Sequence, residues 1–523
     1  MIRIQSLTLL PGQSEDLLKC KAAERLHVAE KHITQLRLRK KSVDARKKPQ
    51  IFLHYTVDVS LDTDEAALIK KLHSPDVLPA PTEKYILPAA FKEEKPRPVV
   101  VGFGPGGIFA ALVLAKCGLR PIVLERGADV DARTEAVNTF WKTGKLNPNS
   151  NVQFGEGGAG TFSDGKLNTG IHDIRIQWVL EQFVRAGADE DILYDAKPHI
   201  GTDRLKTVVK NLREEIIALG GEVRFGVKME KIEEENGAVC AVWANGEKIP
   251  CSHLILAIGH SARDTFQMLL QSGVPMEPKP FSMGVRIEHL QEEIDLSQYG
   301  RQRDTLPPAD YKLNVHLPDG GSAYTFCMCP GGSVVAAASE EGGVVTNGMS
   351  NRARDGKNAN AALLVTLTPE DFPDKSTLGG MYWQRQIEQT AFAAGGGNYR
   401  APMQTVGAFL TGKPCAPTVE PSYAPGVTEY DLHKVLPRKI TDTLEKALPA
   451  LGKRLKGFDN PGAVMTAPET RSSSPVRILR GEDRQSRLRG LYPCGEGAGY
   501  AGGITSAAVD GIKCAEAVVE SLR

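Results

Sequence analysis

Three glycines with the spacing Gly-x-Gly-x-x-Gly, at Gly102, Gly104 and Gly107, carry the clearest chemical meaning in this sequence. The first glycine suits a tight turn, the second lets the backbone approach a phosphate, and the third allows close helix–sheet packing. Glu125 follows 23 residues after Gly102, where a carboxylate accepts hydrogen bonds from a ribose diol. The spacing predicts a dinucleotide-binding turn.

The residues around this turn must form a strand, a turn and a helix to position it. Residues 98–101 are apolar and predict the strand, and Pro105 opens the predicted helix. Free N–H groups and the helix dipole favour an anion at such a helix start, so we expect the pyrophosphate there. The predicted cofactor contacts therefore include Pro105, Gly106 and Arg126, which directly follows the acidic residue.

The C-terminal segment indicates FAD rather than NAD. Glu496, preceded by Gly495, directly follows a predicted strand, and Gly502-Gly503 start a predicted helix that continues from Ile504. In FAD enzymes whose Rossmann domain is split by an insertion, such a segment returns to complete the flavin site. The acid meets the ribityl hydroxyls, and the positive helix end stabilises negative charge at the flavin N1–C2=O edge.

Further cofactor contacts are predicted on two other segments. The strand ending at Ala257 and Gly259 resembles the one that crosses under FAD in this superfamily. Val227 follows a strand at the place where such proteins often contact adenine through backbone atoms, although simple strand packing is the alternative.

A glycine-rich stretch over residues 155–160 is predicted to lie against the flavin ring. Gly157 and Gly158 belong to it, and Lys166 follows shortly after. A lysine near the ring would stabilise a reduced flavin. The alternative is that the glycines only line the pocket and Lys166 is solvated.

The catalytic candidates beyond Lys166 are Arg286, Glu288 and Arg471. Arg286 and Glu288 lie two residues apart on an apparent strand and therefore face one side, where they would bind a carboxylate or carry a proton. An internal Arg–Glu salt bridge is the alternative. Arg471 precedes the closing strand, within reach of substrate or flavin. Cys327 and Cys329 share a strand face, and we expect them to be buried small hydrophobic residues, not a metal site.

The resemblance to a known family rests on eight motifs, at residues 42–48, 154–167, 284–289, 325–332, 344–350, 395–402, 469–478 and 492–511. By these motifs the chain resembles, nearly end to end, a bacterial family described as uncharacterised FAD-dependent dehydrogenases. It is more distantly similar to bile-acid-reductase-type flavoproteins with the same split FAD domain. The resemblance implies FAD as the cofactor and leaves the substrate open.

The order of the predicted elements gives the fold class. We predict an α/β protein with a split Rossmann-like FAD-binding domain, an inserted α+β substrate domain and a small N-terminal βαββ domain. The predicted limits are a βαββ domain over 1–75, a linker over 76–96, FAD-binding parts over 97–280 and 466–523, and the insertion over 281–465. Ordinary globular composition, with 41% hydrophobic and 24% charged residues among 523, agrees with this.

These observations predict an oxidoreductase that moves a hydride between flavin and a small organic substrate. There is no redox Cys-x-x-Cys and no second Gly-x-Gly-x-x-Gly, so NAD(P)H, if used, docks transiently. Two alternatives remain: a flavoprotein that acts on RNA through the basic run at residues 37–48, which is more simply a solvated face, and a non-catalytic redox sensor. Nine scattered cysteines and no predicted membrane span favour a cytoplasmic protein. No metal site is predicted.

Overall fold

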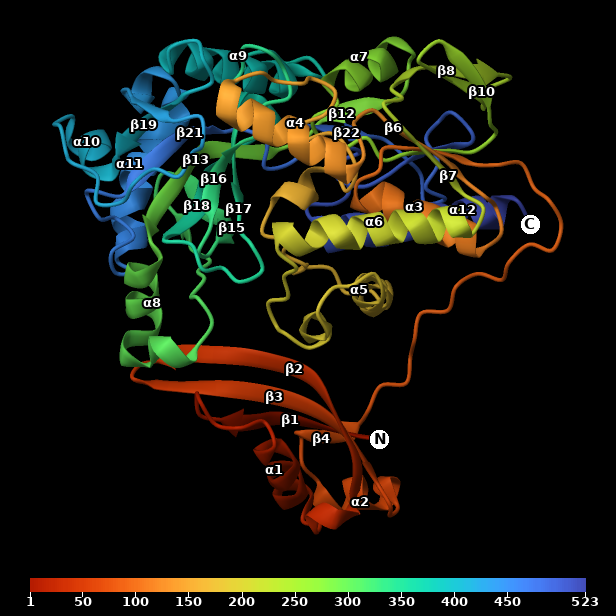
Figure 1. Ribbon diagram of the computed structural model, residues 1–523, viewed down its shortest axis with the longest axis vertical. Coiled ribbons are helices and arrows are strands. Elements are labelled where there is room, and N and C mark those ends of the chain that lie inside the picture. The colour runs from red at the N-terminus through yellow and green to blue at the C-terminus, as the bar shows by residue number, and fades with distance from the viewer.

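The computed structural model describes residues 1–523, which form an N-terminal unit, a parallel-sheet domain and an inserted domain (Figure 1). None of the helices is both long and apolar enough to cross a lipid bilayer. Six hydrophobic clusters hold the chain together, and the largest three lie in the parallel-sheet domain, in the inserted domain and around the smaller meander sheet.

The N-terminal unit is a four-stranded sheet in the order β2-β3-β1-β4. Its strands and helices are β1 (Ile2–Leu9), α1 (Leu17–Leu26), β2 (Ile33–Lys47), β3 (Gln50–Leu61), α2 (Glu65–Leu72) and β4 (Val77–Pro79). Apolar residues alternate along β1 and β3, and their inward faces pack on α1. The predicted βαββ order is present, but β4 falls in residues predicted as linker because it pairs with β1.

The basic run at residues 37–48 lies on β2 and at the start of the turn that leads to β3. Arg39 pairs with Asp58, Lys41 with Glu15, and Arg46 with Asp44. The Lys41 amide also donates to the Tyr194 carbonyl, so β2 docks against the parallel-sheet domain. Much of the positive charge is therefore compensated within the N-terminal unit.

The cofactor domain is built on a five-stranded sheet in the order β23-β11-β5-β6-β7, parallel at every pairing. Its strands are β5 (Val99–Val101), β6 (Ile122–Glu125), β7 (Glu222–Phe225), β11 (Leu254–Leu256) and β23 (Leu491–Pro493). The last strand in sequence completes the sheet beside β11, which is the return predicted for a split domain.

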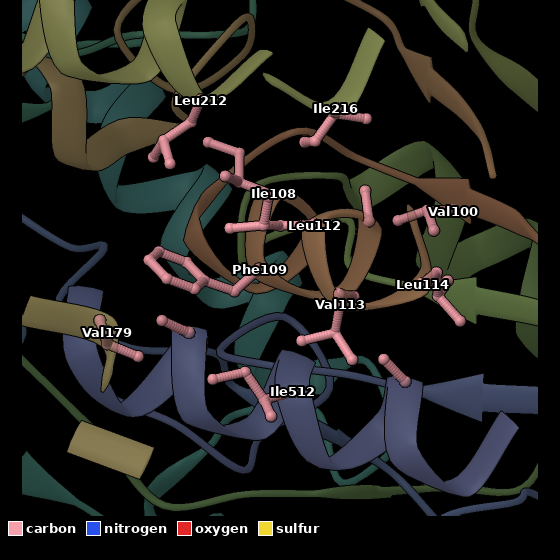
Figure 2. Close-up of a cluster of buried hydrophobic side chains, with 14 of the residues drawn as sticks. Val100, Ile108, Phe109, Leu112, Val113, Leu114, Val179, Leu212, Ile216 and Ile512 are labelled. Carbon is pink, nitrogen blue, oxygen red and sulfur yellow. The ribbon is translucent and has the colours of Figure 1, made fainter. Parts of the chain in front are cut away.

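Helices from distant parts of the sequence cover this sheet. They are α3 (Pro105–Lys116), α4 (Val130–Thr143), α5 (Arg175–Arg185), α6 (Thr202–Ala218) and α12 (Ile504–Ser521). Figure 2 shows Phe109 and Val113 of α3 facing Ile512 of α12, while Ile108 and Leu112 approach α6. Because α3 is buried on nearly every side, its apolar sequence lacks a polar face.

A smaller antiparallel sheet, β10-β9-β8, interrupts the domain between β7 and β11. Its strands are β8 (Met229–Glu235), β9 (Ala238–Ala244) and β10 (Glu247–Pro250), and α7 (Arg263–Gln271) follows β11. These three strands form a β-meander between β7 and β11.

The inserted domain contains a seven-stranded sheet in the order β14-β15-β18-β13-β21-β19-β20. Its strands are β13 (Phe281–Leu290), β14 (Asn314–His316), β15 (Ser322–Cys329), β18 (Asn358–Leu367), β19 (Ala401–Thr405), β20 (Val427–Glu429) and β21 (Val464–Glu469). A hairpin of β16 (Ser333–Ala336) and β17 (Thr346–Met349) lies beside it. Its helices are α8 (Gln291–Tyr299), α9 (Gly379–Ala394), α10 (Val406–Thr411) and α11 (Arg438–Gly452).

The chain enters and leaves this insertion side by side. A short strand before it, β12 (Met276–Pro278), pairs antiparallel with one after it, β22 (Val476–Ile478). The boundary predicted at residue 465 falls inside β21, which pairs with β13 and β19. The insertion therefore extends through β21, and Arg471 lies at its edge.

Candidate cofactor-binding site

A cavity of about 1000 Å³ lies at the carboxyl ends of the parallel strands. Residues that directly follow β5, β6, β11 and β23 line it, and so do residues of β15 in the inserted domain. Ligands of open parallel sheets bind at this edge. The two predicted cofactor segments and the inserted domain therefore share one space.

The glycine turn has the predicted geometry. Gly102 has φ +96°, and a Cβ there would lie 2.2 Å from the Ala257 carbonyl oxygen. A Cβ on Gly107 would lie 1.9 Å from the Gly102 carbonyl oxygen, so this glycine permits helix–strand contact and does not line the cavity. Gly104, Pro105 and Gly106 do line it, at the start of α3, where first-turn N–H groups have no helical partner.

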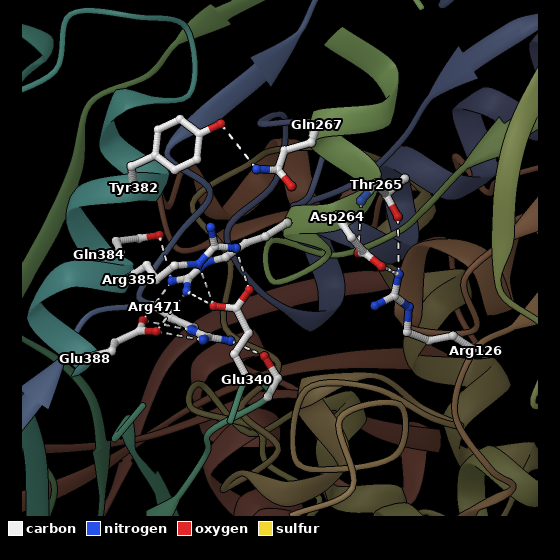
Figure 3. A network of polar contacts seen from close by, with 12 residues as sticks. Arg126, Asp264, Thr265, Gln267, Glu340, Tyr382, Gln384, Arg385, Glu388 and Arg471 are labelled. Carbon is white, nitrogen blue, oxygen red and sulfur yellow. Dashed lines mark hydrogen bonds and ion pairs between the residues drawn. The ribbon is translucent and has the colours of Figure 1, made fainter. Parts of the chain in front are cut away.

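Glu125 lines the cavity but holds the loops around it together. Its carboxylate accepts hydrogen bonds from the amides of Phe103 at 2.8 Å, Gly127 at 2.8 Å and Gly155 at 2.9 Å. The structure thus shows an architectural role for Glu125, and its contact with ribose stays a prediction. The neighbouring Arg126 also lines the cavity, and its guanidinium is paired with Asp264 at 2.8 Å (Figure 3).

The start of α12 is open toward the cavity. Gly502, Gly503 and Ile504 line it, and a Cβ on either glycine would meet no atom within 4 Å. Gly495 and Glu496 line the same wall. Burial raises the pKa of Glu496 to about 7, which Lys279 only partly opposes, and no protein donor stabilises the carboxylate. This carboxylate lacks the partners that Glu125 has.

The remaining predicted cofactor contacts divide between the cavity wall and the packing behind it. Ala257, Gly259 and Gly158 line the cavity. Gly157 does not, because its N–H donates to the Phe103 carbonyl and a Cβ would meet Thr161 Oγ1 at 2.0 Å. Val227 lines the cavity, but its N–H already donates to the Glu125 carbonyl.

Of the predicted catalytic residues, Lys166 lines the cavity and its ammonium donates to the Met328 carbonyl. Arg286 and Glu288 do not line the cavity, contrary to the predicted substrate contact. Both are fully buried because β13 lies inside the seven-stranded sheet. Arg286 pairs with Glu469 at 3.1 Å, and Glu288 accepts from Ser422 and Asn358, so the predicted alternative of an Arg286–Glu288 salt bridge is not formed either.

Arg471 lines the cavity, but its guanidinium is held by a buried ion cluster. It donates to Glu388 at 3.0 and 2.8 Å (Figure 3), and Arg263 donates to the same carboxylate at 2.9 and 2.8 Å. Burial by itself would raise the pKa of Glu388. The two arginines outweigh burial and hold this pKa well below its usual range. Arg471 therefore joins α9 to the segment after β21, and the structure gives it a positioning role.

Several charged or nucleophilic residues that the sequence did not place in the site also line the cavity, among them Lys279, Cys327 and Glu469. Lys279 and Glu469 flank the two ends of the insertion, so no local spacing relates them. The Cys-x-Cys spacing is visible in the sequence, but its exposure to the cavity depends on a bulge in β15.

The donor set fits FAD. Two helix starts, at α3 and α12, point positive ends at one elongated cavity, which suits a pyrophosphate and a flavin edge. Glu496 offers unpaired oxygens to ligand hydroxyls, and the bare backbone at Gly104 leaves room for a phosphate to approach.

Comparison with known proteins agrees with this reading. The profile described as "FAD-dependent protein, C-terminal domain-like" matches residues 280–472, and a domain of unknown function matches residues 1–60. A protein of Clostridium beijerinckii described as uncharacterized is 49% identical over 528 residues, covering 99% of this chain and 98% of its own. The chain belongs to this family of FAD-dependent proteins. FAD is its cofactor.

Among solved structures, the similarity of this FAD-dependent protein to those that match it is distant. L-proline dehydrogenase from P. horikoshii is 13% identical with a TM-score of 0.36, over 82% of this chain and 95% of that one. The brominase Bmp2 is 13% identical with a TM-score of 0.38, over 82% and 79%. Glycine oxidase from Bacillus cereus is 12% identical with a TM-score of 0.31, over 82% and 96%.

Proposed function

We propose that this FAD-dependent protein is an oxidoreductase that moves a hydride between its flavin and a small organic substrate. The observation that carries the proposal is the shared cavity. Cofactor segments at Gly104 and Glu496 and the inserted domain's Tyr311, Thr325 and Phe326 line one space of about 1000 Å³. A bound flavin therefore has a wall from another domain facing it, where a substrate fits.

The chain's own groups prepare this cavity for FAD. The N-terminus of α3 would hold the pyrophosphate, and Glu496 would accept hydrogen bonds from the ribityl hydroxyls. The positive start of α12 would stabilise negative charge at the N1–C2=O edge. FAD, when bound, supplies the hydride chemistry at its ring.

The inserted domain supplies the substrate side. Lys166 spans from the cofactor domain to the Met328 carbonyl at the end of β15, so it ties the two walls together. Burial lowers the pKa of Lys279, which stands in the cavity near Glu496. These groups, with the aromatic and polar side chains of the insertion, would fix a small molecule against the ring and exclude water.

The source of electrons is part of the proposal. The chain has one dinucleotide turn, and FAD would occupy it. NADH or NADPH would therefore reduce the flavin by docking transiently in the same cavity. The alternative is that the substrate itself reduces the flavin.

The test is anaerobic reduction of the purified holoprotein with NADH and with NADPH, followed by a screen of oxidants. We expect one reductant, or one class of substrate, to bleach the flavin and one oxidant to restore it. Free FAD with the Gly107→Ala protein is the control for non-specific chemistry. A protein that takes up no FAD on reconstitution would contradict the proposal.

A further inference from the structure

Cys327 and Cys329 lie on the cavity side of β15, where the strand is irregular. The pairing of β15 with β18 shifts register between Phe326 and Cys329, so the two cysteines flank a bulge. Bulges re-aim side chains and are frequent beside active sites. Cys327 lines the cavity, whereas Cys329 is fully buried directly behind it.

The backbone at Cys327 is held in an unusual conformation. Its φ is +42°, in the left-handed region that residues other than glycine seldom adopt. Such strain persists only where the surroundings enforce it, and it concentrates at functional sites. Arg286 enforces it here, because its guanidinium donates to the Cys327 carbonyl at 2.5 Å.

The surroundings of the pair favour a thiolate. Arg286 reaches the Cys329 sulfur at 3.5 Å, and Lys166 adds a second positive charge nearby. The Cys329 thiol donates to the Cys327 carbonyl at 3.3 Å. The interaction with Cys329 lowers the pKa of Cys327 to about 6, with Arg286 and Lys166 acting in the same direction against burial. The thiolate is the nucleophilic and electron-donating form of cysteine.

Glu469 competes with this thiolate for Arg286. Its carboxylate lies 3.1 Å from the guanidinium and accepts from Thr346. Burial raises the pKa of Glu469 to about 7 although Arg286 opposes the rise, and Cys327 contributes to it. When Glu469 holds a proton, the charge of Arg286 is left to the sulfurs.

Other buried cysteines of this chain differ from this pair. Burial raises the pKa of Cys251 to about 12 and that of Cys117 to about 11, as expected for inert structural thiols. Cys494 and Cys514 are also close together, but the Arg480 guanidinium beside them is paired with Asp510. The pKa of Cys494 is raised. Among these close pairs, only that of Cys327 and Cys329 combines cavity exposure with a lowered thiol pKa.

We propose that Cys327 and Cys329 are a redox-active dithiol that exchanges two electrons with the flavin through the shared cavity. In oxidation, the Cys327 thiolate and the Cys329 thiol form an S–S bond, the Cys329 S–H bond breaks, and two electrons and one proton leave. Oxidised flavin takes up two electrons and one proton, so the exchange balances without another reactant. The biological use of this dithiol rests on the proposed oxidoreductase function. The electron exchange itself requires only that the protein binds FAD.

A disulfide across a single intervening residue closes a tight ring. Strained disulfides are more easily reduced and belong to the labile, catalytic class rather than the structural one. The pair would therefore cycle, holding a second pair of electrons beside those of the flavin.

The first test is an anaerobic titration of the oxidised holoprotein with dithionite, which reduces flavin without any substrate. We expect four electrons per FAD in the wild type and two in Cys327→Ser and Cys329→Ser. Cys240→Ser, whose half-buried thiol lies on the β8–β9 sheet away from the cavity, should still take four. A wild-type value of two would overturn the proposal.

The second test reads the thiols directly and does not require a variant to fold. Diamide-oxidised holoprotein is denatured, alkylated and mapped by mass spectrometry, and the peptide with Cys327 and Cys329 should be protected until reduced. Both cysteines remaining alkylatable after oxidation would overturn the proposal. Because neither test uses a hydride donor or a metabolite, a failure here is distinguishable from failure of the proposed oxidoreductase function.

Discussion

The two acidic residues predicted to hold the cofactor, Glu125 and Glu496, stand in opposite situations. Glu125 ends the parallel strand β6, Glu496 follows the parallel strand β23, and both line the same cavity. Glu125 accepts three backbone hydrogen bonds, whereas Glu496 accepts none from the protein and its pKa is raised by burial to about 7. Sequence position alone makes them look equivalent.

This difference indicates that Glu125 stabilises the fold, whereas Glu496 is available to bind a ligand. A buried carboxylate that is fully hydrogen-bonded stabilises the fold without a ligand, and removing it leaves unpaired donors. A buried carboxylate without donors is costly until something supplies them. We therefore expect the first half of the site to be built before FAD binds and the second half to be completed by FAD.

The largest loss of stability should come from a substitution in the glycine turn between β5 and α3. Gly107→Ala places a Cβ 1.9 Å from the Gly102 carbonyl oxygen, with backbone on both sides of the clash. We expect destabilisation of about 4 kcal/mol or more and loss of FAD, measured by thermal unfolding and by flavin content. Gly502→Ala, whose Cβ meets no atom within 4 Å, is the matched control. Equal stability of the two variants would contradict the assignment.

Glu125→Ala should have the next largest effect. It leaves the amides of Phe103, Gly127 and Gly155 without their acceptor, at about 1–3 kcal/mol for a buried unpaired group. We expect the apoprotein to lose about 3 kcal/mol or more of unfolding free energy. Urea unfolding of the FAD-free protein measures this. If stability falls only in the presence of FAD, Glu125 is a ligand contact and not an organiser of loops.

Glu496→Gln should act in the opposite way on the apoprotein. Because folding raises its pKa from about 4.5 to about 7, the folded state keeps a proton that the unfolded state releases, and stability falls as pH rises across that window. The loss is at most about 3 kcal/mol. Unfolding at pH 5, 6, 7 and 8 should show this slope in the wild type and a flatter one in Glu496→Gln.

The same variant should bind FAD more weakly, because an amide offers fewer acceptor sites to the ribityl hydroxyls. We expect about a tenfold rise in Kd, equivalent to about 1.4 kcal/mol, by fluorescence titration. Unchanged affinity would mean that Glu496 does not contact the cofactor.

The smallest effect should come from Lys279→Met. Lys279 lowers the pKa of Glu496, so its removal moves the pH window of the apoprotein upward, by less than about one pH unit. The pH series used for Glu496→Gln measures the shift. A shift to lower pH would contradict the assigned sign.

The sequence by itself determined the cofactor and the outline of the fold. Gly102, Gly104 and Gly107 fix a turn through steric rules that act within a few residues, and the apolar period around them fixes strand and helix. Near the C-terminus, the short spacing of Glu496 and Gly502-Gly503 likewise predicted a strand end followed by a helix start. Such short-range rules predicted the split parallel sheet, the insertion and FAD.

Only the tertiary structure decided which polar groups are free to act. Arg286 and Glu288 share a strand face as predicted, but β17 lies over Arg286 on that face and Ser422 contacts Glu288, so both side chains are buried. Arg471 reaches the cavity wall yet is bound by Glu388 from α9, and Cys327 reaches it through a bulge. Whether a side chain is paired, buried or exposed depends on partners far away in sequence, such as Glu388 for Arg471 and Glu469 for Arg286, which no local spacing records.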